Sequence, residues 1–223
     1  MAEVVEMSVS GNQSLTRAEE VLAFWFATPG ISDSPERRQK IWFGGSDATD
    51  QMIRERFETD VKKAVVGEYD DWAQSARGSL ALIILLDQFS LNIHRDEARS
   101  YLQSAMALPV ALKAIRRGFD QFVPIEWRLF FYLPLEHSED VRVQRQSVRL
   151  FEQLAAYGRE LGQSVGHGDD AGLPARLDAY LDYAKRHAEV VEQFGRMPYW
   201  NELLGRESTR EEATWLASGG PDF

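Results

Sequence analysis

The sequence contains no cysteine, and this absence removes a whole group of chemistries. A chain without thiols forms no disulfide, no thiolate metal site and no cysteine nucleophile. The absence agrees with a reducing compartment, and we expect the protein in the cytoplasm. Residues 1–14 also lack the basic and apolar regions of a secretory signal, so we expect no export.

The sequence has no long apolar run, and it has fewer basic than acidic residues. The longest strictly apolar run is the seven residues Leu80 to Leu86, whereas a membrane-spanning helix needs ~20. Lys and Arg number 25 against 35 Asp and Glu, a net charge of −10. Such a surface repels phosphate backbones and anionic lipid. We therefore expect neither a nucleic-acid partner nor a membrane.

Period-two alternation of apolar residues is scarce, whereas spacings of three, four and seven recur throughout. The pattern predicts an all-α protein, with about nine helices in an antiparallel stack that forms one domain over residues 14–223. Residues 1–13 are expected to be disordered. From the buried segment GSLALIILLDQFSL onward, the predicted helices cover residues 78–91, 97–107, 109–117, 124–132, 139–161, 175–194 and 209–217.

Two polar residues fall on faces that should be apolar. Gln144 lies three residues after Val141 on the apolar stripe of helix 139–161, and His187 lies on the inner face of helix 175–194. A buried amide or imidazole needs hydrogen-bond partners. One interpretation is that both tie core helices together. The other is that they face a ligand, with His187 as a general base or metal ligand.

The most apolar segment of the chain ends in Asp87 and Gln88. An unpaired carboxylate would be costly there, so Asp87 is expected to meet a cation. An Asp87–Arg128 or Asp87–Arg196 pair is the natural expectation. The arginines available for this role are Arg95, Arg128, Arg196 and Arg206.

The stretch LPLEHSED packs three acids and a histidine into five positions. Ser138 followed by Glu139 and Asp140 is typical of a helix start, with a hydroxyl N-cap and acids at the positive end of the dipole. That interpretation leaves Glu136 and His137 at a junction between two helices. They suit an acid–base couple, or with His187 the start of a hard-ion site. Their spacing matches no zinc signature, and we predict no metal.

The stretch FGRMPYWNELLGREST contributes Arg196, Asn201 and Arg206. Each arginine follows a glycine, which lets the backbone come close to another group. Two arginines ten residues apart are suited to binding a carboxylate or a phosphate group. They equally suit the neutralisation of buried acids, which is the use we favour.

These stretches together resemble the bacterial family catalogued as domain of unknown function 924, over about residues 18 to 223. The most specific marks are FYLPLEHSED followed four residues on by Gln144, and H-x6-FGR-x-P-x2-N-x3-GR-x-ST-x-EE, which begins at His187. The resemblance implies an all-helical protein with a tetratricopeptide-like superhelical arrangement. It also implies that the polar residues named above form one cluster.

The chain departs from that family in two places. The family shows LLDQFPRN where this chain has LLDQFSLN, and FGRFPHRN where it has FGRMPYWN. Two cationic positions and one histidine are thereby missing. An anion held by those groups would bind weakly here, and Tyr199 and Trp200 suit stacking on a flat ligand instead.

We expect a binding protein that holds a partner peptide, a partner protein or a small ligand in a polar-lined groove, without a cofactor. The alternative is an enzyme in which Glu136, His137 and His187 do acid–base work on a small anionic substrate. A third interpretation makes the polar set an internal clamp that fixes helix order. The six tryptophans would permit a homodimer face. The expected ligand-binding residues are Asp87, Gln88, Arg95, Arg128, Gln144, Arg196, Asn201 and Arg206.

Overall fold

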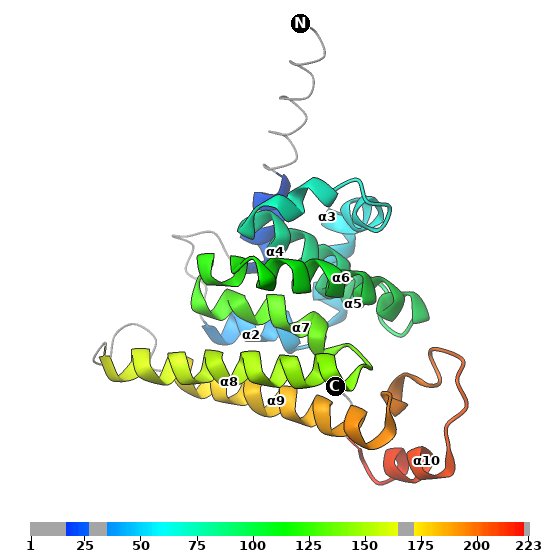
Figure 1. The fold of residues 1–223 in the computed structure, drawn as a ribbon. Coiled ribbons are helices and arrows are strands. Elements are labelled where there is room, and N and C mark those ends of the chain that lie inside the picture. Colours follow the sequence, from blue (N-terminus) through cyan, green and yellow to red (C-terminus); the bar gives the residue numbers. More distant parts are fainter. Residues whose placement is uncertain (1–16, 27–34, 165–171, 221–223) are drawn as a thin grey trace, which may run out of the picture. The chain divides into compact units, whose positions relative to one another are not determined.

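The computed structural model describes residues 17–26, 35–164 and 172–220, and within these ranges the regular structure is entirely helical (Figure 1). The all-α prediction is therefore confirmed. Contacts divide the chain into two compact units, Met1–Arg95 with Arg99–Pro134, and Asp96–Ala98 with Leu135–Phe223. The expected disorder of residues 1–13 lies outside the described residues. The single-domain and tetratricopeptide-like arrangements stay predictions.

The first unit contains the earlier helices. After a helix over residues 17–26, its elements are α2 (Pro35–Phe43), α3 (Asp47–Val65), a 3₁₀ turn (Asp70–Gln74), α4 (Ala76–Ile84), a π-helix (Leu85–Phe89), α5 (Ser90–Ile93), α6 (Ala98–Arg116), two further 3₁₀ turns (Phe119–Phe122 and Ile125–Arg128) and α7 (Leu129–Glu136). Helices α6 and α7 each include residues of both units.

Helix α3 shows how the sequence pattern becomes a buried face. Ser46 caps its start by accepting a hydrogen bond from the Thr49 N–H. The apolar positions at spacings of four, four and three are buried, as their periodicity predicts. This buried face consists of Ile53, Phe57, Val61 and Ala64.

The segment from α4 to α5 is helical and buried, as expected for residues that are apolar almost all round. Leu80 to Leu85 are each 0–1% exposed. Its 18 residues Ala76–Ile93 are apolar enough, with a mean hydropathy of 1.2, to cross a membrane by length and composition, but 78% of that window is buried inside the protein. The core helix of a globular domain has the same character.

Two prolines that lie at or just beyond predicted helix boundaries are found inside helices. Pro109 lies within α6, which joins the two segments predicted at 97–107 and 109–117. Pro134 lies within α7, which runs on to Glu136 rather than ending at residue 132. A proline removes one backbone hydrogen bond but leaves the helical φ unchanged. The remaining bonds and packing of each helix outweigh that loss.

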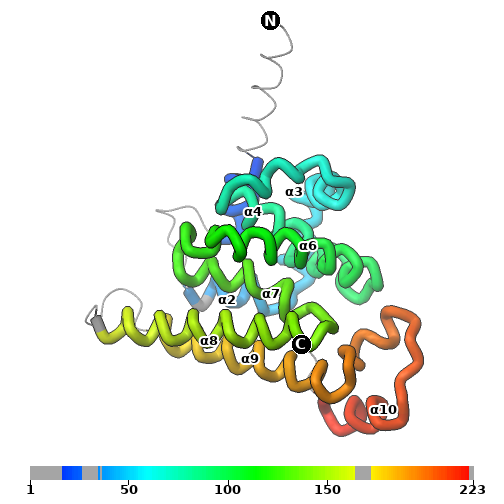
Figure 2. Tube along the Cα trace, in the orientation of Figure 1, coloured from blue at the N-terminus to red at the C-terminus, as the bar shows by residue number. Residues whose placement is uncertain are grey.

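The second unit is built around a helical hairpin of α8 (Val141–Ser164) and α9 (Leu173–Phe194), which run alongside each other (Figure 2). Arg145 forms an ion pair with Glu192, and Arg159 with Asp178, so the two helices are antiparallel. The 3₁₀ turn Pro198–Trp200 and helix α10 (Arg210–Ala217) complete the unit.

Capping hydrogen bonds close the end of α9 and the start of α10. Gly195 adopts the left-handed conformation with φ of 69° and closes α9 by donating its N–H to the Val191 carbonyl. Thr209 and Glu212 form a capping box at the start of α10, in which each side chain accepts the other residue's N–H.

Candidate functional site

Helix α8 begins two residues later than predicted, and its cap is Asp140 rather than Ser138. The Asp140 carboxylate accepts the Arg142 N–H at 2.7 Å, while the Ser138 hydroxyl accepts the Asp140 N–H at 3.2 Å. A carboxylate is as good a cap as a hydroxyl, and the serine instead tightens the turn before the helix. The Arg142 side chain also lowers the pKa of Asp140 to about 2.

Gln144 is fully buried, as its position on the apolar stripe predicted, and its amide orientation is fixed. Its Nε2 donates to the Glu136 and Ser138 backbone carbonyls, each at 2.6 Å. Carbonyl oxygens only accept, so the amide cannot be flipped. The amide ties the end of α7 to the first turns of α8, and its Oε1 points away from that turn.

Glu136 and His187 meet inside the second unit, although 51 positions separate them in the sequence. The side chains are 2% and 4% exposed, and a Glu136 carboxylate oxygen lies 3.5 Å from His187 Nδ1. The same Nδ1 is 3.0 Å from the Tyr183 carbonyl oxygen. Because that oxygen only accepts, Nδ1 carries the proton and Nε2 carries the lone pair.

The imidazole of His187 is neutral at physiological pH. Burial lowers its pKa to about 3, because a charged ring is poorly solvated there; nearby His137 and Arg186 lower it further, and the hydrogen bond to Tyr183 opposes the shift. His137 itself is half-buried in the link between α7 and α8.

Ser147 is the residue of this region that sequence analysis missed. It lies one turn after Gln144 and is 0% exposed. Within the described part of the chain, the Ser147 Oγ and the Gln144 Oε1 have no hydrogen-bond partner. The antiparallel pairing of α8 and α9 places His187 within about one turn of Ser147. Glu136, Gln144, Ser147 and His187 are called the polar cluster below.

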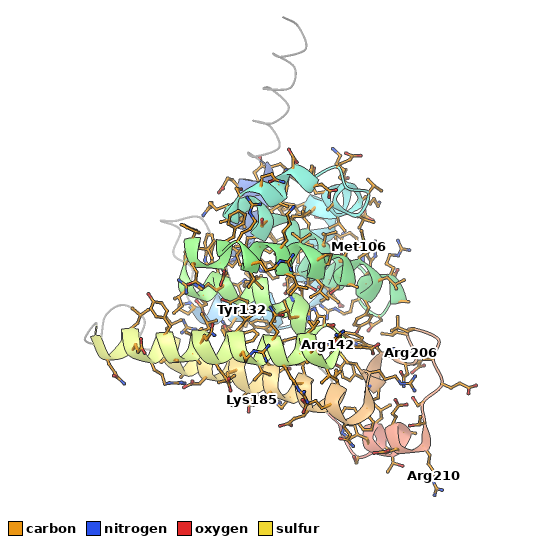
Figure 3. The ribbon with its side chains drawn as sticks, in the orientation of Figure 1. Met106, Tyr132, Arg142, Lys185, Arg206 and Arg210 are labelled. Atoms are coloured by element: carbon orange, nitrogen blue, oxygen red, sulfur yellow. The ribbon has the colours of Figure 1, made fainter. Side chains whose placement is uncertain are left out.

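The arginines of the C-terminal stretch are held by acids within the second unit. Arg206 pairs with both oxygens of Glu139 at 2.7 and 2.9 Å, and Glu139 also accepts the Met197 N–H at 2.8 Å. Arg206 lies on the stretch that leads to α10, while Arg142 marks the first turn of α8, just after Glu139 (Figure 3). The pair fastens that stretch to the start of α8.

A second pair closes the same stretch on α10. Arg196 forms two hydrogen bonds of 2.6 Å with the carboxylate of Glu212 and donates to the Glu207 carbonyl. The Asn201 amide donates to Ser208 and Glu212. The Arg196 guanidinium, with backbone donation from Thr209, lowers the pKa of Glu212 to about 2 against the cost of burial. Neutralisation of acids, the use we favoured, is thus what these arginines do.

The remaining predicted residues lie in the first unit. Asp87 is 0% exposed and accepts hydrogen bonds from the Ser104 hydroxyl and from Gln88 Nε2, the latter at 2.7 Å. Both Asp87 and Gln88 belong to the π-helix, a rare geometry that is frequent at functional sites. An Asp87 ion pair with Arg128 or Arg196 stays a prediction.

Arg95 and Arg128 have partners of their own in this unit. Arg95 forms a two-point pair with buried Asp50 at 2.6 and 2.9 Å. Arg128 donates to the Gln121 side chain at 2.9 Å. Sequence analysis missed Asp50, because an acid in the first turn of a helix normally faces water. The structure therefore assigns the predicted polar residues to several local networks, of which the polar cluster is one.

The described residues contain no group of three or more His, Asp or Glu side chains that could hold a metal ion. A shallow, open concavity of about 500 Å³ lies on α10, where Figure 3 labels Arg210. It contains none of the predicted site residues. Its lining consists of Arg210, Glu211, Thr214 and Trp215.

The described residues form an all-α protein with several local networks of buried polar side chains. The model of the family described as "Bacterial protein of unknown function (DUF924)" matches residues 21–220, and the chain belongs to that family. A solved structure, "Protein of Unknown Function ATU0120 from Agrobacterium tumefaciens", is similar at 34% identity and a TM-score of 0.72. The match covers 92% of this chain and 99% of that one. No curated protein matched the chain.

Proposed function

We propose that this chain is a binding protein whose second unit takes a small polar ligand into the polar cluster. One observation carries the proposal: the Gln144 Oε1 and the Ser147 Oγ are fully buried, and no described residue offers either a hydrogen bond. Each unmet buried group costs about 1–3 kcal/mol. A ligand that supplied the missing bonds would recover that free energy on binding.

The arginine pairs of the second unit are held mainly by their acids, although Arg206 Nε and Asn201 Oδ1 are also buried without a partner among the described residues. Glu139 with Arg206, and Glu212 with Arg196, are joined by two-point hydrogen bonds. Their charges are used to fix the C-terminal stretch, as an internal clamp would be. In the polar cluster it is the Gln144 Oε1 and the Ser147 Oγ that have no hydrogen-bond partner among the described residues, and this pair of neighbouring atoms favours a ligand there.

The acid–base alternative has less support. A general base works best when its pKa lies near the working pH. Burial lowers the pKa of His187 to about 3, so the ring is a weak base at neutral pH. A role in orienting Glu136, which lies 3.5 Å away, suits a neutral imidazole better.

A thermal-shift screen of the full chain against small alcohols, amines, amides, carboxylates and short peptides tests the proposal. A ligand at 100 times its Kd stabilises by about 2.7 kcal/mol, which raises the Tm by roughly 5–10 °C for a chain of this size. The shift should saturate with ligand concentration, whereas a single trapped water gives no such response.

The matched variants are Ser147→Ala and Ser79→Ala. Both serines are buried, 0% and 1% exposed, and both hydroxyls are without a partner among the described residues, but Ser79 lies on α4 in the first unit. A ligand of the polar cluster should lose most of its Tm shift in Ser147→Ala and keep it in Ser79→Ala. Equal loss in both variants, or no saturable ligand in the screen, would refute the proposal.

A further inference from the structure

Helix α6 presents large apolar residues to solvent and buries small ones. Leu102 and Met106 lie one turn apart on it and are 64% and 38% exposed (Figure 3 labels Met106). Within the described part of the chain, no other helix exposes two large apolar side chains. A helix at the surface of a soluble protein normally turns such residues inward. The residues that α6 buries are instead Ser100, Ser104, Ala107, Ala111 and Ala114.

The exposed apolar residues of α6 belong to one continuous stripe, called the outer stripe below. Successive residues of a helix are about 100° apart, so positions three, four, seven, eleven and fourteen residues beyond the first share a face with it. The outer stripe consists of Leu102, Ala105, Met106, Pro109, Lys113 and Arg116, all of them exposed and all in the first unit.

Helix α6 carries charge of one sign only. Its 19 residues include Arg99, Lys113 and Arg116 but no Asp or Glu, whereas the whole chain has 35 acidic residues and a net charge of −10. Lys113 and Arg116 lie in the last turn of the helix. The outer stripe is therefore apolar along most of its length and cationic at its C-terminal end, and a partner that fits it must be apolar and acidic in turn.

Charge also decides among the possible occupants. Two copies of α6 packed in parallel would set Lys113 and Arg116 against themselves, and packed antiparallel they would set both against the turn that carries Arg99. An anionic membrane meets the net charge of −10 of the whole chain, which repels it. Salt screens charges beyond about 8 Å at physiological ionic strength, so a partner as narrow as one helix responds chiefly to α6 itself.

We propose that the outer stripe is a docking surface for an acidic, amphipathic helix of another protein. The apolar face of that helix packs on Leu102, Met106 and Pro109, where the unbranched methionine adapts its shape to the partner. Its Asp or Glu residues pair with Lys113 and Arg116. Helix α6 is about 28 Å long, which accommodates about five turns of a partner helix. The polar cluster lies in the second unit, so this inference does not depend on the ligand proposed there.

Three fluorescently labelled peptides of about 20 residues test the inference by anisotropy with the full chain at pH 7.5. The acidic peptide has leucines at spacings of three and four and glutamates on either side of them. The basic peptide has lysine in place of every glutamate, and the third peptide has the acidic composition in an order without an apolar face. The acidic peptide should bind saturably, at least tenfold more tightly than the other two, and more weakly as salt is added.

The apolar half of the outer stripe is tested by the double variant Leu102→Gln with Met106→Gln. Both side chains are exposed, so the fold should tolerate the change, and binding of the acidic peptide should weaken at least tenfold. The matched control is Val66→Gln, because Val66 is 71% exposed at the end of α3 in the same unit but lies outside the outer stripe. This control should bind the peptide as the natural chain does.

The cationic half is tested by Lys113→Gln with Arg116→Gln. Binding of the acidic peptide should weaken at least fivefold at low salt, and its dependence on salt should become shallower. The matched control is Lys62→Gln with Lys63→Gln, which removes the same charge from the last turn of α3. Equal weakening in this control would mean that only the overall charge matters, and the inference would be wrong.

The other occupants are distinguishable outcomes. Sedimentation velocity that shows a dimer of the natural chain and a monomer of Leu102→Gln with Met106→Gln would assign the outer stripe to self-association. Binding to phosphatidylserine vesicles that the same variant loses would assign it to lipid. In either case, or if the acidic peptide binds no better than the basic one or does not bind at all, the inference is wrong.

Discussion

Acid should destabilise this protein well above the range in which its carboxylates titrate, because of His187. The His187 imidazole has its ordinary pKa of 6.5 in the unfolded chain. In the folded chain, where the ring is buried beside Tyr183, its pKa is about 3. Between those values the unfolded chain binds a proton that the folded chain does not. Stability is therefore greatest above pH 6.5 and is lost progressively as the pH falls from 6.5 toward 3.

The loss amounts to about 1.4 kcal/mol for each pH unit below 6.5. Lowering the pH from 7.5 to 5.5 should therefore remove about 1.4 kcal/mol of unfolding free energy through His187 alone. In a chain of this size the Tm should fall by roughly 3–6 °C. The groups that face or act on the ring are Glu136, which lies 3.5 Å from Nδ1, and the nearby His137 and Arg186.

Urea titrations at pH 7.5 and 5.5 measure this loss, and His187→Asn isolates it. The asparagine amide can still donate to the Tyr183 carbonyl from nearly the position of Nδ1, but it does not titrate. The difference between the two proteins removes the contribution of the other three histidines. If His187→Asn loses as much stability as the natural chain over this interval, the argument from burial is refuted.

Three other substitutions have expected outcomes, each measured by urea unfolding. Ser147→Ala and its control Ser79→Ala should leave the unfolding free energy unchanged or raise it by up to about 1 kcal/mol, because each removes an unmet hydroxyl. Glu139→Gln should cost about 1.5–3 kcal/mol by weakening two charged hydrogen bonds to Arg206. Glu212→Gln should likewise cost about 1.5–3 kcal/mol at pH 7 by weakening two charged hydrogen bonds to Arg196. That cost should shrink as the pH falls from 4.5 toward 2, where the carboxylate of the natural chain takes up its proton.

Each of these expectations has a contrary result. Destabilisation by more than about 1 kcal/mol in Ser147→Ala alone would mean that its hydroxyl makes a bond that the fold needs. An unchanged free energy of unfolding in Glu139→Gln would show that the ion pair of Glu139 with Arg206 adds nothing to stability. A Glu212→Gln cost that stays constant down to pH 2 would contradict the lowered pKa of that carboxyl.

Helical periodicity was enough to predict most of the fold. The predicted buried segment from α4 to α5 is confirmed, and the buried face of α3 and the Thr209–Glu212 capping box likewise depend on residues close together in the sequence. The exceptions have physical reasons. Pro109 and Pro134 cost one hydrogen bond each, and whether a helix tolerates that loss depends on packing with distant residues.

The candidate site was predictable only in part. Gln144 and His187 were predicted to face inward from their spacing, and they do. Ser147 gives no such signal, since a small neutral side chain is common on either face of a helix. Which acids pair with Arg196 and Arg206 depends on the path of the chain between α9 and α10. Glycines and a proline leave no periodic pattern there from which that path could be predicted.

The wide turn at Leu85–Phe89 holds one residue more than an α-helical turn would. Excising a single residue from LLDQF would turn it into an ordinary α-helical turn, and the helical residues on either side would keep their facing. The same excision from the middle of α3 or α8 would rotate everything that follows by about 100°. A one-residue deletion should therefore harm the fold less here than in those helices, while it removes the wide turn that carries the buried Asp87 and Gln88.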